Sequence, residues 1–267
     1  MVVFPNGKIN LGLNVIRKRI DGYHDLETVF YPTRTQEVLE IIHSDVLEFT
    51  TSGLPVAGDA KDNLCLKAYH LLKKDIPDLP AVKIHLHKVL PMGAGLGGGS
   101  ADGAFALNLL NQTFKLKLTA QQLLSYALQL GSDCPFFILN KPCFASGRGE
   151  HLLPITIDLS SYKIILVHPG IHVSTAMAFS KLKPGKPSIS IQQLITQPVE
   201  TWKEQLVNDF EEPVFEMFPE IKEIKEGLYN AGALYASMSG SGSCVYGIFE
   251  DKEITLPVFP PHYSIHT

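Results

Sequence analysis

The sequence lacks several features that would place it in a specialised class. Its four cysteines, at positions 65, 134, 143 and 244, are widely separated and form no Cys-x-x-Cys pair. This pattern argues against a disulfide framework or a zinc ribbon and favours a reducing compartment. No apolar run reaches the roughly 18 residues of a membrane helix, and the start "MVVFPNGKIN" has no signal-peptide pattern. We therefore expect a cytoplasmic protein with no membrane partner.

The sequence also lacks a strong excess of either charge. It has 23 Lys and Arg against 27 Asp and Glu, for a formal net charge of −4. General attraction to nucleic acid is therefore not expected, and any site for a polyanion must be local. The 267 residues, 45% of them hydrophobic, suffice for one large domain or two modest ones. The oligomeric state stays open at this point.

Glycine, in contrast, is concentrated in one place. The segment "PMGAGLGGGSADGAFAL" (91–107) has five glycines between 93 and 99 and then takes a helical pattern from Ser100. Each glycine costs roughly 0.5–1 kcal/mol against alanine in a regular element, so something must compensate. Glycines allow successive N–H groups to point at an anion, and a helix N-terminus adds a positive partial charge. The segment therefore predicts a phosphate-binding loop.

Two other glycine-rich motifs fit this loop less well. Residues 93–98 match G-x-G-x-x-G, but that dinucleotide fingerprint needs an acidic residue about 20 positions later, and "TFKLKL" has none. The preceding strands also read as antiparallel. A Walker A loop needs a lysine after its glycines, and none follows here. A dinucleotide-dependent oxidoreductase and a catalytically silent nucleotide-binding regulator nevertheless stay as alternatives.

The hydrophobic pattern predicts a mixture of strands and helices. "KINLGLNVI" alternates as a half-buried strand with a polar face, and Asp21-Gly22 predicts a hairpin turn after it. Thr119 and Gln122 form a capping box for a helix that Gly131 ends. Further predictions are helices over 63–75, 202–210 and 219–232, and strands over 37–44, 46–53, 81–90 and 162–170 and within 142–150 and 233–250. The order indicates an α+β protein with a second unit from about residue 160.

Four segments together resemble one family. "PMGAGLGGGSAD" resembles the phosphate-binding motif of the GHMP kinases (galactose, homoserine, mevalonate and phosphomevalonate kinases). "KINLGLNV…RIDGYHDLETVF", "LGSDCPFFI" and "MSGSGSCVYGIF" are similar to further motifs of that family, in the expected order over about 8–249. The resemblance implies a two-domain GHMP kinase fold, with a ribosomal protein S5 domain 2-like domain over 1–158 and a ferredoxin-like domain over 159–267.

The resemblance also implies an activity. "DGYH", the triple glycine and "GSDCPFF" are most similar to members that use ATP and Mg²⁺ to phosphorylate a cytidine-diphosphate-linked methylerythritol in isoprenoid precursor synthesis. We therefore expect a small-molecule kinase, with ATP and this substrate as its partners. A GHMP kinase for mevalonate, homoserine or a sugar is the nearest alternative. The protein ligands of Mg²⁺ are left unassigned.

Two residues are expected to carry the chemistry. The resemblance assigns the catalytic base to Asp133, and the alternative role for this residue is a helix N-cap. Lys8 lies on the polar face of the first strand, on the same side as Asn10. A lysine near a carboxylate favours the ionised base and stabilises charge on the transferred phosphoryl group. The alternative for Lys8 is an ordinary solvated lysine.

The ATP site is predicted along the glycine loop. Its residues are Pro91, Met92, Gly93, Ala94, Gly95, Leu96, Gly97, Gly98, Gly99, Ser100 and Ala101. Ala101 stands where the most similar members have a second serine. Asn63 and Lys88 are further candidates for contact with the nucleotide, with a helix cap and a surface charge as their respective alternatives.

The substrate site is predicted from residues distributed along the chain. By resemblance, Tyr23 and His24 recognise cytosine, and Thr175 and Phe179 form the other half of that pocket, although a core phenylalanine is an alternative for Phe179. Asn10 is expected to orient the substrate or Asp133. Gly240 and Gly242 are expected to approach the acceptor or the phosphates through backbone N–H groups. We interpret His85 and His87 as a structural or solvated pair rather than as metal ligands.

Overall fold

The computed structural model of the chain describes residues 1–56, 58–182 and 184–267. It divides into two compact units. The first contains Met1–Gly7, Arg34–Met92 and Gly97–Lys141, and the second contains Lys8–Thr33, Gly93–Leu96 and Pro142–Thr267. In this division residues 8–33 group with the carboxyl-terminal half of the chain. The single boundary at residue 158 stays a prediction.

The first unit is built on a four-stranded sheet. Its strands are β1 (Val2–Val3), β4 (Val38–His43), β5 (Glu48–Gly53) and β6 (Val82–Lys88), in the order β1-β4-β6-β5. β4 pairs antiparallel with β1 and β6, whereas β5 pairs parallel with β6. The chain returns from β5 to β6 through η1 (Ala60–Asp62) and α1 (Leu64–Asp75). The expectation that all strands before the loop are antiparallel is therefore wrong for this pair.

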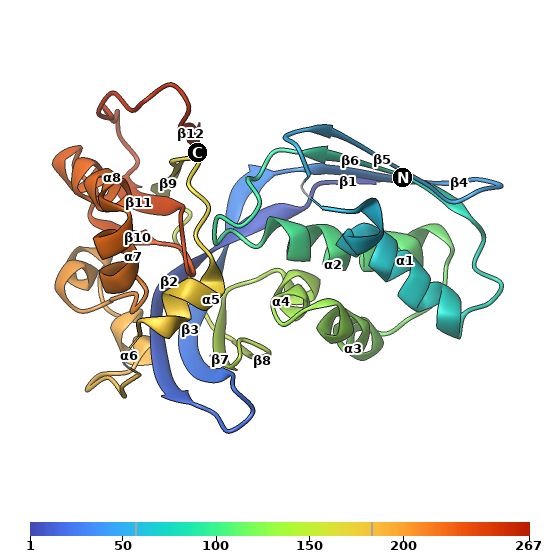
Figure 1. Cartoon of the computed structure of the whole chain (residues 1–267), viewed down its shortest axis with the longest axis horizontal. Helices are drawn as coiled ribbons and strands as arrows, with labels where there is room; N and C mark the ends of the chain where they lie inside the picture. Colours follow the sequence, from blue (N-terminus) through green and yellow to red (C-terminus); the bar gives the residue numbers. More distant parts are fainter. Residues whose placement is uncertain (57, 183) are drawn as a thin grey trace. The chain divides into compact units, whose positions relative to one another are not determined.

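Helices α1, α2 (Gly98–Thr113), α3 (Ala120–Leu130) and α4 (Cys134–Leu139) lie on one side of this sheet (Figure 1). α2 buries a face of small and branched residues that includes Ala104, Leu107 and Leu110. The predicted capping box is confirmed: the Thr119 side chain accepts from the Gln122 N–H, and the Gln122 side chain accepts from the Thr119 N–H. In α2, Gly98 and Ala101 are also buried, so the first turn of this helix is packed as well.

The second unit contains the first hairpin. β2 (Asn6–Lys18), β3 (His24–Gln36), β7 (Cys143–Gly147) and β8 (His151–Pro154) form a sheet in the order β2-β3-β7-β8. β2 and β3 are joined through Asp21-Gly22, as predicted. The polar face of β2 is also covered, because Lys8, Asn10 and Asn14 are all buried. The expected half-buried strand is therefore buried on both faces along most of its length.

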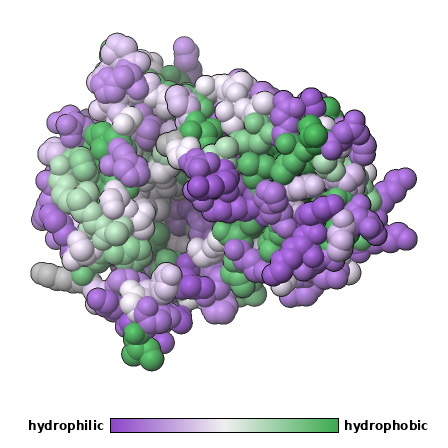
Figure 2. Space-filling model, turned by 45° about the vertical axis from the view of Figure 1, so that its right-hand side comes forward, coloured by the Kyte–Doolittle hydropathy of each residue, from purple (hydrophilic) through white to green (hydrophobic). Residues whose placement is uncertain are grey.

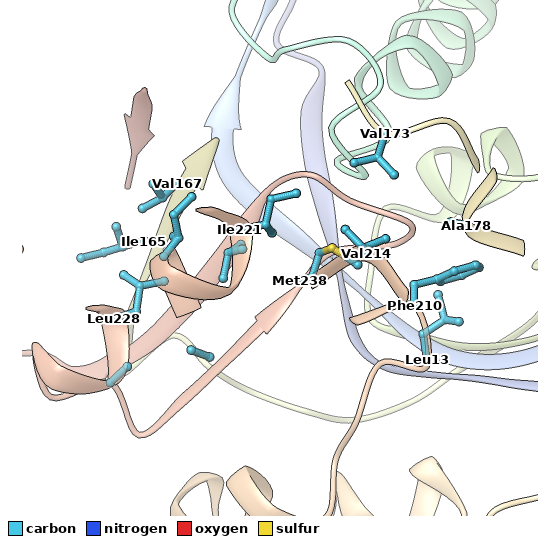
Figure 3. Close-up of a cluster of buried hydrophobic side chains, with 14 of the residues drawn as sticks. Leu13, Ile165, Val167, Val173, Ala178, Phe210, Val214, Ile221, Leu228 and Met238 are labelled. Carbon is cyan, nitrogen blue, oxygen red and sulfur yellow. The ribbon is translucent and has the colours of Figure 1, made fainter. Parts of the chain in front are cut away.

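The second sheet of this unit is antiparallel throughout. β9 (Tyr162–His168), β10 (Tyr235–Met238), β11 (Val245–Glu250) and β12 (Ser264–His266) lie in the order β10-β11-β9-β12. The unit also contains α5 (Thr175–Ser180), α6 (Ile191–Leu194), η2 (Val199–Glu204), α7 (Glu211–Met217) and α8 (Pro219–Asn230). Figure 3 shows its core, where Leu13 and Phe210 lie with Val214, Ile221 and Met238.

The predicted helix over 202–210 is wrong. A 3₁₀ helix ends at Glu204, and the following residues pair with β2: Leu13 N–H donates to Val207 O (2.9 Å) and Asp209 N–H donates to Leu13 O (2.9 Å). Backbone groups of Leu13 that need partners thus override the local helical pattern.

The surface shown in Figure 2 carries both hydrophilic and hydrophobic residues. Exposed hydrophobic side chains include Ile20 at the tip of the first hairpin and Met92 in the glycine loop. Within the described ranges, no helix is both long and apolar enough to cross a membrane.

Candidate active site

The glycine loop joins β6 to α2 and uses its glycines for backbone shape. Gly93, Gly95 and Gly97 have φ angles of 69°, 79° and 70°. These angles lie in the left-handed region, which residues other than glycine rarely adopt because of their Cβ atom. Gly97 is the N-cap of α2 and has no side chain, so it cannot cap the first N–H groups of the helix. α2 begins at Gly98, two residues before the predicted start, and phosphate binding stays a prediction.

The first half of the loop packs against the turn between β10 and β11. A Cβ atom on Gly95 would lie 1.9 Å from the carbonyl oxygen of Ser239. The Ser239 hydroxyl donates to Gly95 O (2.8 Å), and Cys244 N–H donates to Ala94 O (3.1 Å). The structure thus brings two predicted glycine motifs together, and Gly95 is required by this close backbone approach.

Asp133 lies at the start of α4, beside the first turn of α2. The residue after it, Cys134, is buried and shares a side-chain hydrogen bond with Ser100. Burial raises the pKa of the Cys134 thiol to about 12, so it stays protonated. Asp133 occupies the N-cap position of α4, but within the described chain its side chain makes no capping hydrogen bond. The cap interpretation is therefore not supported, and the catalytic role stays a prediction.

Lys8 is buried, which contradicts the solvated alternative. Its Nζ donates to Asn10 Oδ1 (2.6 Å) and lies 5.0 Å from the centre of the Phe30 ring. Asn10 Nδ2 in turn donates to Thr28 Oγ1 (3.0 Å). Lys8 N–H donates to Leu96 O (2.8 Å), which fixes this end of β2 to the glycine loop. A buried ammonium group with a fixed direction suits charge stabilisation better than a flexible surface lysine.

The predicted cytidine residues lie together in part. The His24 ring stacks on Phe179 with centroids 4.6 Å apart and planes at 19°, and Phe179 meets Phe210 edge to face at 4.8 Å. Burial, with a smaller contribution from the charge of Lys18, lowers the pKa of His24 and favours the neutral ring. A neutral imidazole both donates and accepts hydrogen bonds. The Phe179 ring therefore contacts the core residue Phe210 edge to face and stacks on the ring of His24.

Tyr23 lies beside this pair in sequence but is 57% exposed. The guanidinium of Arg148 lies 4.9 Å from the centre of its ring. Sequence reasoning did not select Arg148, because a single arginine in a tight turn gives no motif. The pair presents a flat aromatic ring and a positive charge at the surface of the second unit.

Thr175 and the Gly240–Gly242 turn are also brought together. Thr175 Oγ1 lies 3.0 Å from the hydroxyl oxygen of Ser241. Gly240 and Gly242 have φ angles of 58° and 94°, and a Cβ on Gly242 would lie 2.7 Å from the sulfur of Met238. Both glycines are therefore needed for the shape of the turn, and substrate contact by these residues stays a prediction.

The structure favours the simpler alternative for Asn63. Its Oδ1 accepts from Cys65 N–H (2.9 Å), which makes it the N-cap of α1. For Lys88 the surface alternative is wrong, because its side chain is 2% exposed and its ammonium binds Glu37 and Asp102. Nucleotide contact by Asn63 and Lys88 stays untested, but the ammonium of Lys88 already has two carboxylate partners.

His85 and His87 have hydroxyl partners on the neighbouring strand, which fits a structural pair, and the interpretation stays a prediction. Thr50 and Ser52 on the parallel neighbour β5 hydrogen-bond His85, and Ser52 also hydrogen-bonds His87 (2.8–2.9 Å). Among the residues that the structure describes, no group of three His, Cys, Asp or Glu side chains is placed to hold a metal ion.

Asn208 is a residue that sequence reasoning missed. Its Nδ2 donates to Met238 O (2.7 Å) and to Gly240 O (2.9 Å), and its Oδ1 accepts from Phe210 N–H (3.0 Å). It is buried and holds the turn of the second glycine motif in place. The adjacent Asn208-Asp209 pair was a usable signal, since both residue types favour turns over helix interiors.

Comparison with known proteins identifies the family. The GHMP kinases N terminal domain matches residues 63–141, and the GHMP kinases C terminal domain matches residues 190–254. A relative from Azobacteroides pseudotrichonymphae is 51% identical over 267 residues, covering 100% of this chain and 99% of its own. A relative from Bacteroides thetaiotaomicron is 52% identical over 261 residues, covering 96% and 94%. Both are named 4-diphosphocytidyl-2-C-methyl-D-erythritol kinase. The chain belongs to this family of GHMP kinases.

Solved structures agree with the family. A crystal structure of 4-(cytidine 5'-diphospho)-2C-methyl-D-erythritol kinase superposes with a TM-score of 0.80 and 31% identity, covering 93% of this chain and 90% of that one. A mevalonate kinase structure, at 13% identity and a TM-score of 0.71, shares the fold. The predicted α+β GHMP kinase fold is thus confirmed, and the chain is a small-molecule kinase that uses ATP. The dinucleotide-dependent oxidoreductase alternative is wrong.

Proposed function

We propose that the protein transfers the γ-phosphoryl group of ATP to the 2-hydroxyl of 4-diphosphocytidyl-2-C-methyl-D-erythritol. The products are ADP and the 2-phosphate, and the reaction belongs to non-mevalonate isoprenoid precursor synthesis in the cytoplasm. The relatives that are about half identical over the whole chain carry the substrate assignment. Within the molecule, the binding of ATP is supported by the N-terminus of α2, which follows glycines in the left-handed region and has no side-chain cap. This arrangement suits a bound polyphosphate.

Phosphoryl transfer requires alignment and charge neutralisation more than covalent help. In this proposal residues 91–101 line the ATP site, and backbone N–H groups within 93–100 hold its phosphates. Asp133 accepts the proton of the 2-hydroxyl of the substrate. The oxygen of that hydroxyl attacks the γ-phosphorus in line. Lys8 stabilises the negative charge that spreads over the transferred group, and its bond to Asn10 fixes the direction of its ammonium.

The acceptor side of the proposal uses the second unit. His24 and Tyr23 supply hydrogen bonds and an aromatic ring for cytosine, and the stacked Phe179 supplies a second ring. Thr175 and the turn over 240–242 hold the remainder of the acceptor through hydroxyl and N–H groups. A neutral His24 reads the polar edge of the base without adding charge.

Mg²⁺ enters this proposal with ATP. It keeps several waters and binds phosphate oxygens with few protein ligands, so it requires no group of three protein ligands. The glycine loop fits this mode, because it supplies N–H groups to the phosphates that carry the ion. Bound in this way, Mg²⁺ neutralises charge on the phosphates, and we assign no side chain as its ligand.

The test is ADP release on adding 4-diphosphocytidyl-2-C-methyl-D-erythritol to the protein with Mg-ATP. Asp133→Asn removes the proposed base and should lower kcat by about 10²–10⁴-fold. Asp158→Asn is the matched control, because Asp158 is an exposed aspartate outside both glycine motifs, and it should retain wild-type turnover.

Different outcomes address different parts of the proposal. Turnover of mevalonate, homoserine or a sugar instead of this acceptor would keep the fold and overturn the substrate. Nucleotide binding without turnover of any acceptor would favour the silent regulator. Full activity of Asp133→Asn would contradict the assignment of the base.

A further inference from the structure

Three ionisable side chains of the first unit are buried together beside the first residue of α2. The Lys88 ammonium lies 2.8 Å from Glu37 Oε1 and 2.8 Å from Asp102 Oδ2. The three side chains are 2%, 0% and 3% exposed. No motif predicted this cluster, because its members are separated by 51 and 14 positions in the sequence.

The cluster connects the segments that frame the loop. Lys88 ends β6, Glu37 precedes β4, and Asp102 lies in the first turns of α2. Glu37 Oε1 also accepts from Leu90 N–H (2.9 Å), three residues before the loop glycines begin at 93. A Cβ on Gly98 would lie 3.1 Å from Lys88 Nζ. The first residue of α2 thus rests directly on the ammonium group.

The charges within the cluster do not balance if all three groups are ionised. Two carboxylates and one ammonium would leave a net charge of −1. This charge would be buried next to the N-terminus of α2, where the phosphates are expected. That charge would be costly to bury and would repel the ligand. Asp102 Oδ1 is buried and, among the described residues, has no hydrogen-bond partner, so no donor stabilises a negative charge on it. A proton on Asp102 removes the net charge.

The electrostatics agree with the geometry. Burial, followed by the hydrogen bond with Glu37, raises the pKa of Asp102 well above its usual range. Burial alone would lower the pKa of Lys88, but the charges of Asp102 and Glu37 outweigh it and raise that pKa. The favoured state therefore has a charged Lys88 and a neutral Asp102.

We propose that Lys88 is a positioning residue for ATP: its ammonium, held by the carboxyl groups of Glu37 and Asp102, fixes both ends of the phosphate loop. The cluster adds no net charge behind the bound phosphates. This role replaces direct contact between Lys88 and the nucleotide, and it rests on the proposed function insofar as the loop binds ATP. The nucleotide affinity therefore depends on side chains that lie behind the loop.

The experiment compares nucleotide affinity in three single variants by calorimetric titration with Mg-ADP in the absence of acceptor. Lys88→Met should weaken binding about tenfold or more, because it leaves Glu37 without its cation and frees the loop. Asp102→Asn replaces a neutral carboxyl by a neutral amide, so affinity should stay within about twofold. Lys83→Met removes an exposed ion pair with Glu48 from the same strand and should have no effect.

A second readout addresses the proton directly. The infrared spectrum of the wild-type protein at neutral pH should contain the C=O stretch of a buried carboxylic acid that Asp102→Asn abolishes. If Lys88→Met does not fold, the double variant Glu37→Gln, Lys88→Met takes its place, because it leaves no unpaired buried charge. Kinetics should show the loss in the KM for ATP, with the KM for the acceptor unchanged.

The outcomes separate this proposal from the proposed function. Unchanged affinity in the folded Lys88 variant would overturn the positioning role. Absence of the carboxylic acid band, or a loss in Asp102→Asn as large as in Lys88→Met, would overturn the protonated aspartate. A wild-type protein that binds Mg-ADP but fails to turn over the acceptor would overturn only the proposed acceptor.

Discussion

Gly99→Ala distinguishes glycines required by the ligand from glycines required by the fold. Gly99 is the second residue of α2, and its φ is outside the left-handed region. Apart from its two chain neighbours and the helix backbone, a Cβ added there would meet no atom of the described residues within 4 Å. Gly95 differs, because its Cβ would lie 1.9 Å from Ser239 O. The protein itself thus gives no reason for glycine at position 99.

The expected effect on stability is a small gain. Alanine is favoured over glycine by about 1 kcal/mol inside a helix, and we expect about half of that in the first turn. For a chain of this size, such a gain raises Tm by about 1–2 °C. The added methyl group occupies space above the first turn of α2, where the phosphates are expected. We therefore expect Mg-ATP or Mg-ADP to bind about tenfold more weakly, a cost of about 1.4 kcal/mol.

The assay combines thermal unfolding without nucleotide and calorimetric titration with Mg-ADP. Gly185→Ala is the control, since Gly185 also has open space around its Cβ and lies outside the predicted ATP site. It should leave nucleotide affinity unchanged. Gly99→Ala with raised or equal Tm and wild-type affinity would refute the phosphate role of this residue. A large loss of Tm would instead show that its surroundings are tighter than the structure indicates.

Two further predictions concern the second unit. Asn208→Ala leaves the carbonyls of Met238 and Gly240 without the donor that Asn208 supplies. The free energy of unfolding, measured by urea denaturation, should therefore fall by about 1–3 kcal/mol. Unchanged stability and kcat would contradict the role of Asn208 in holding the turn. Burial, and then the neighbouring His266, lowers the pKa of His168 from 6.5 to about 4. The unfolded state therefore binds more protons in this window, and stability should fall by about 1–3 kcal/mol as pH drops from 6.5 to 4. His168→Gln should flatten that part of the stability curve, and an equal slope in both proteins would contradict the assignment.

The sequence by itself determined the elements whose signals are local. The strands β2 and β6, the alternating burial of β6, the Thr119 capping box and the glycine-rich segment that leads into α2 all appear where they were predicted. Each of these depends on neighbouring residues, through side-chain periodicity, a cap or φ preference. The family motifs added the expected catalytic residues, because they are contiguous stretches that a single sequence displays.

The tertiary structure alone decided the features that join distant segments. The pairing of residues 207–209 with Leu13 replaced a predicted helix, because backbone groups of β2 needed partners. The environment of Lys88 depends on Glu37, 51 positions away, and burial turned a predicted surface charge into an internal support. Asn208 similarly acts on a turn about 30 positions later. Such contacts follow from packing and from the cost of burying unpaired polar groups, which no local pattern encodes.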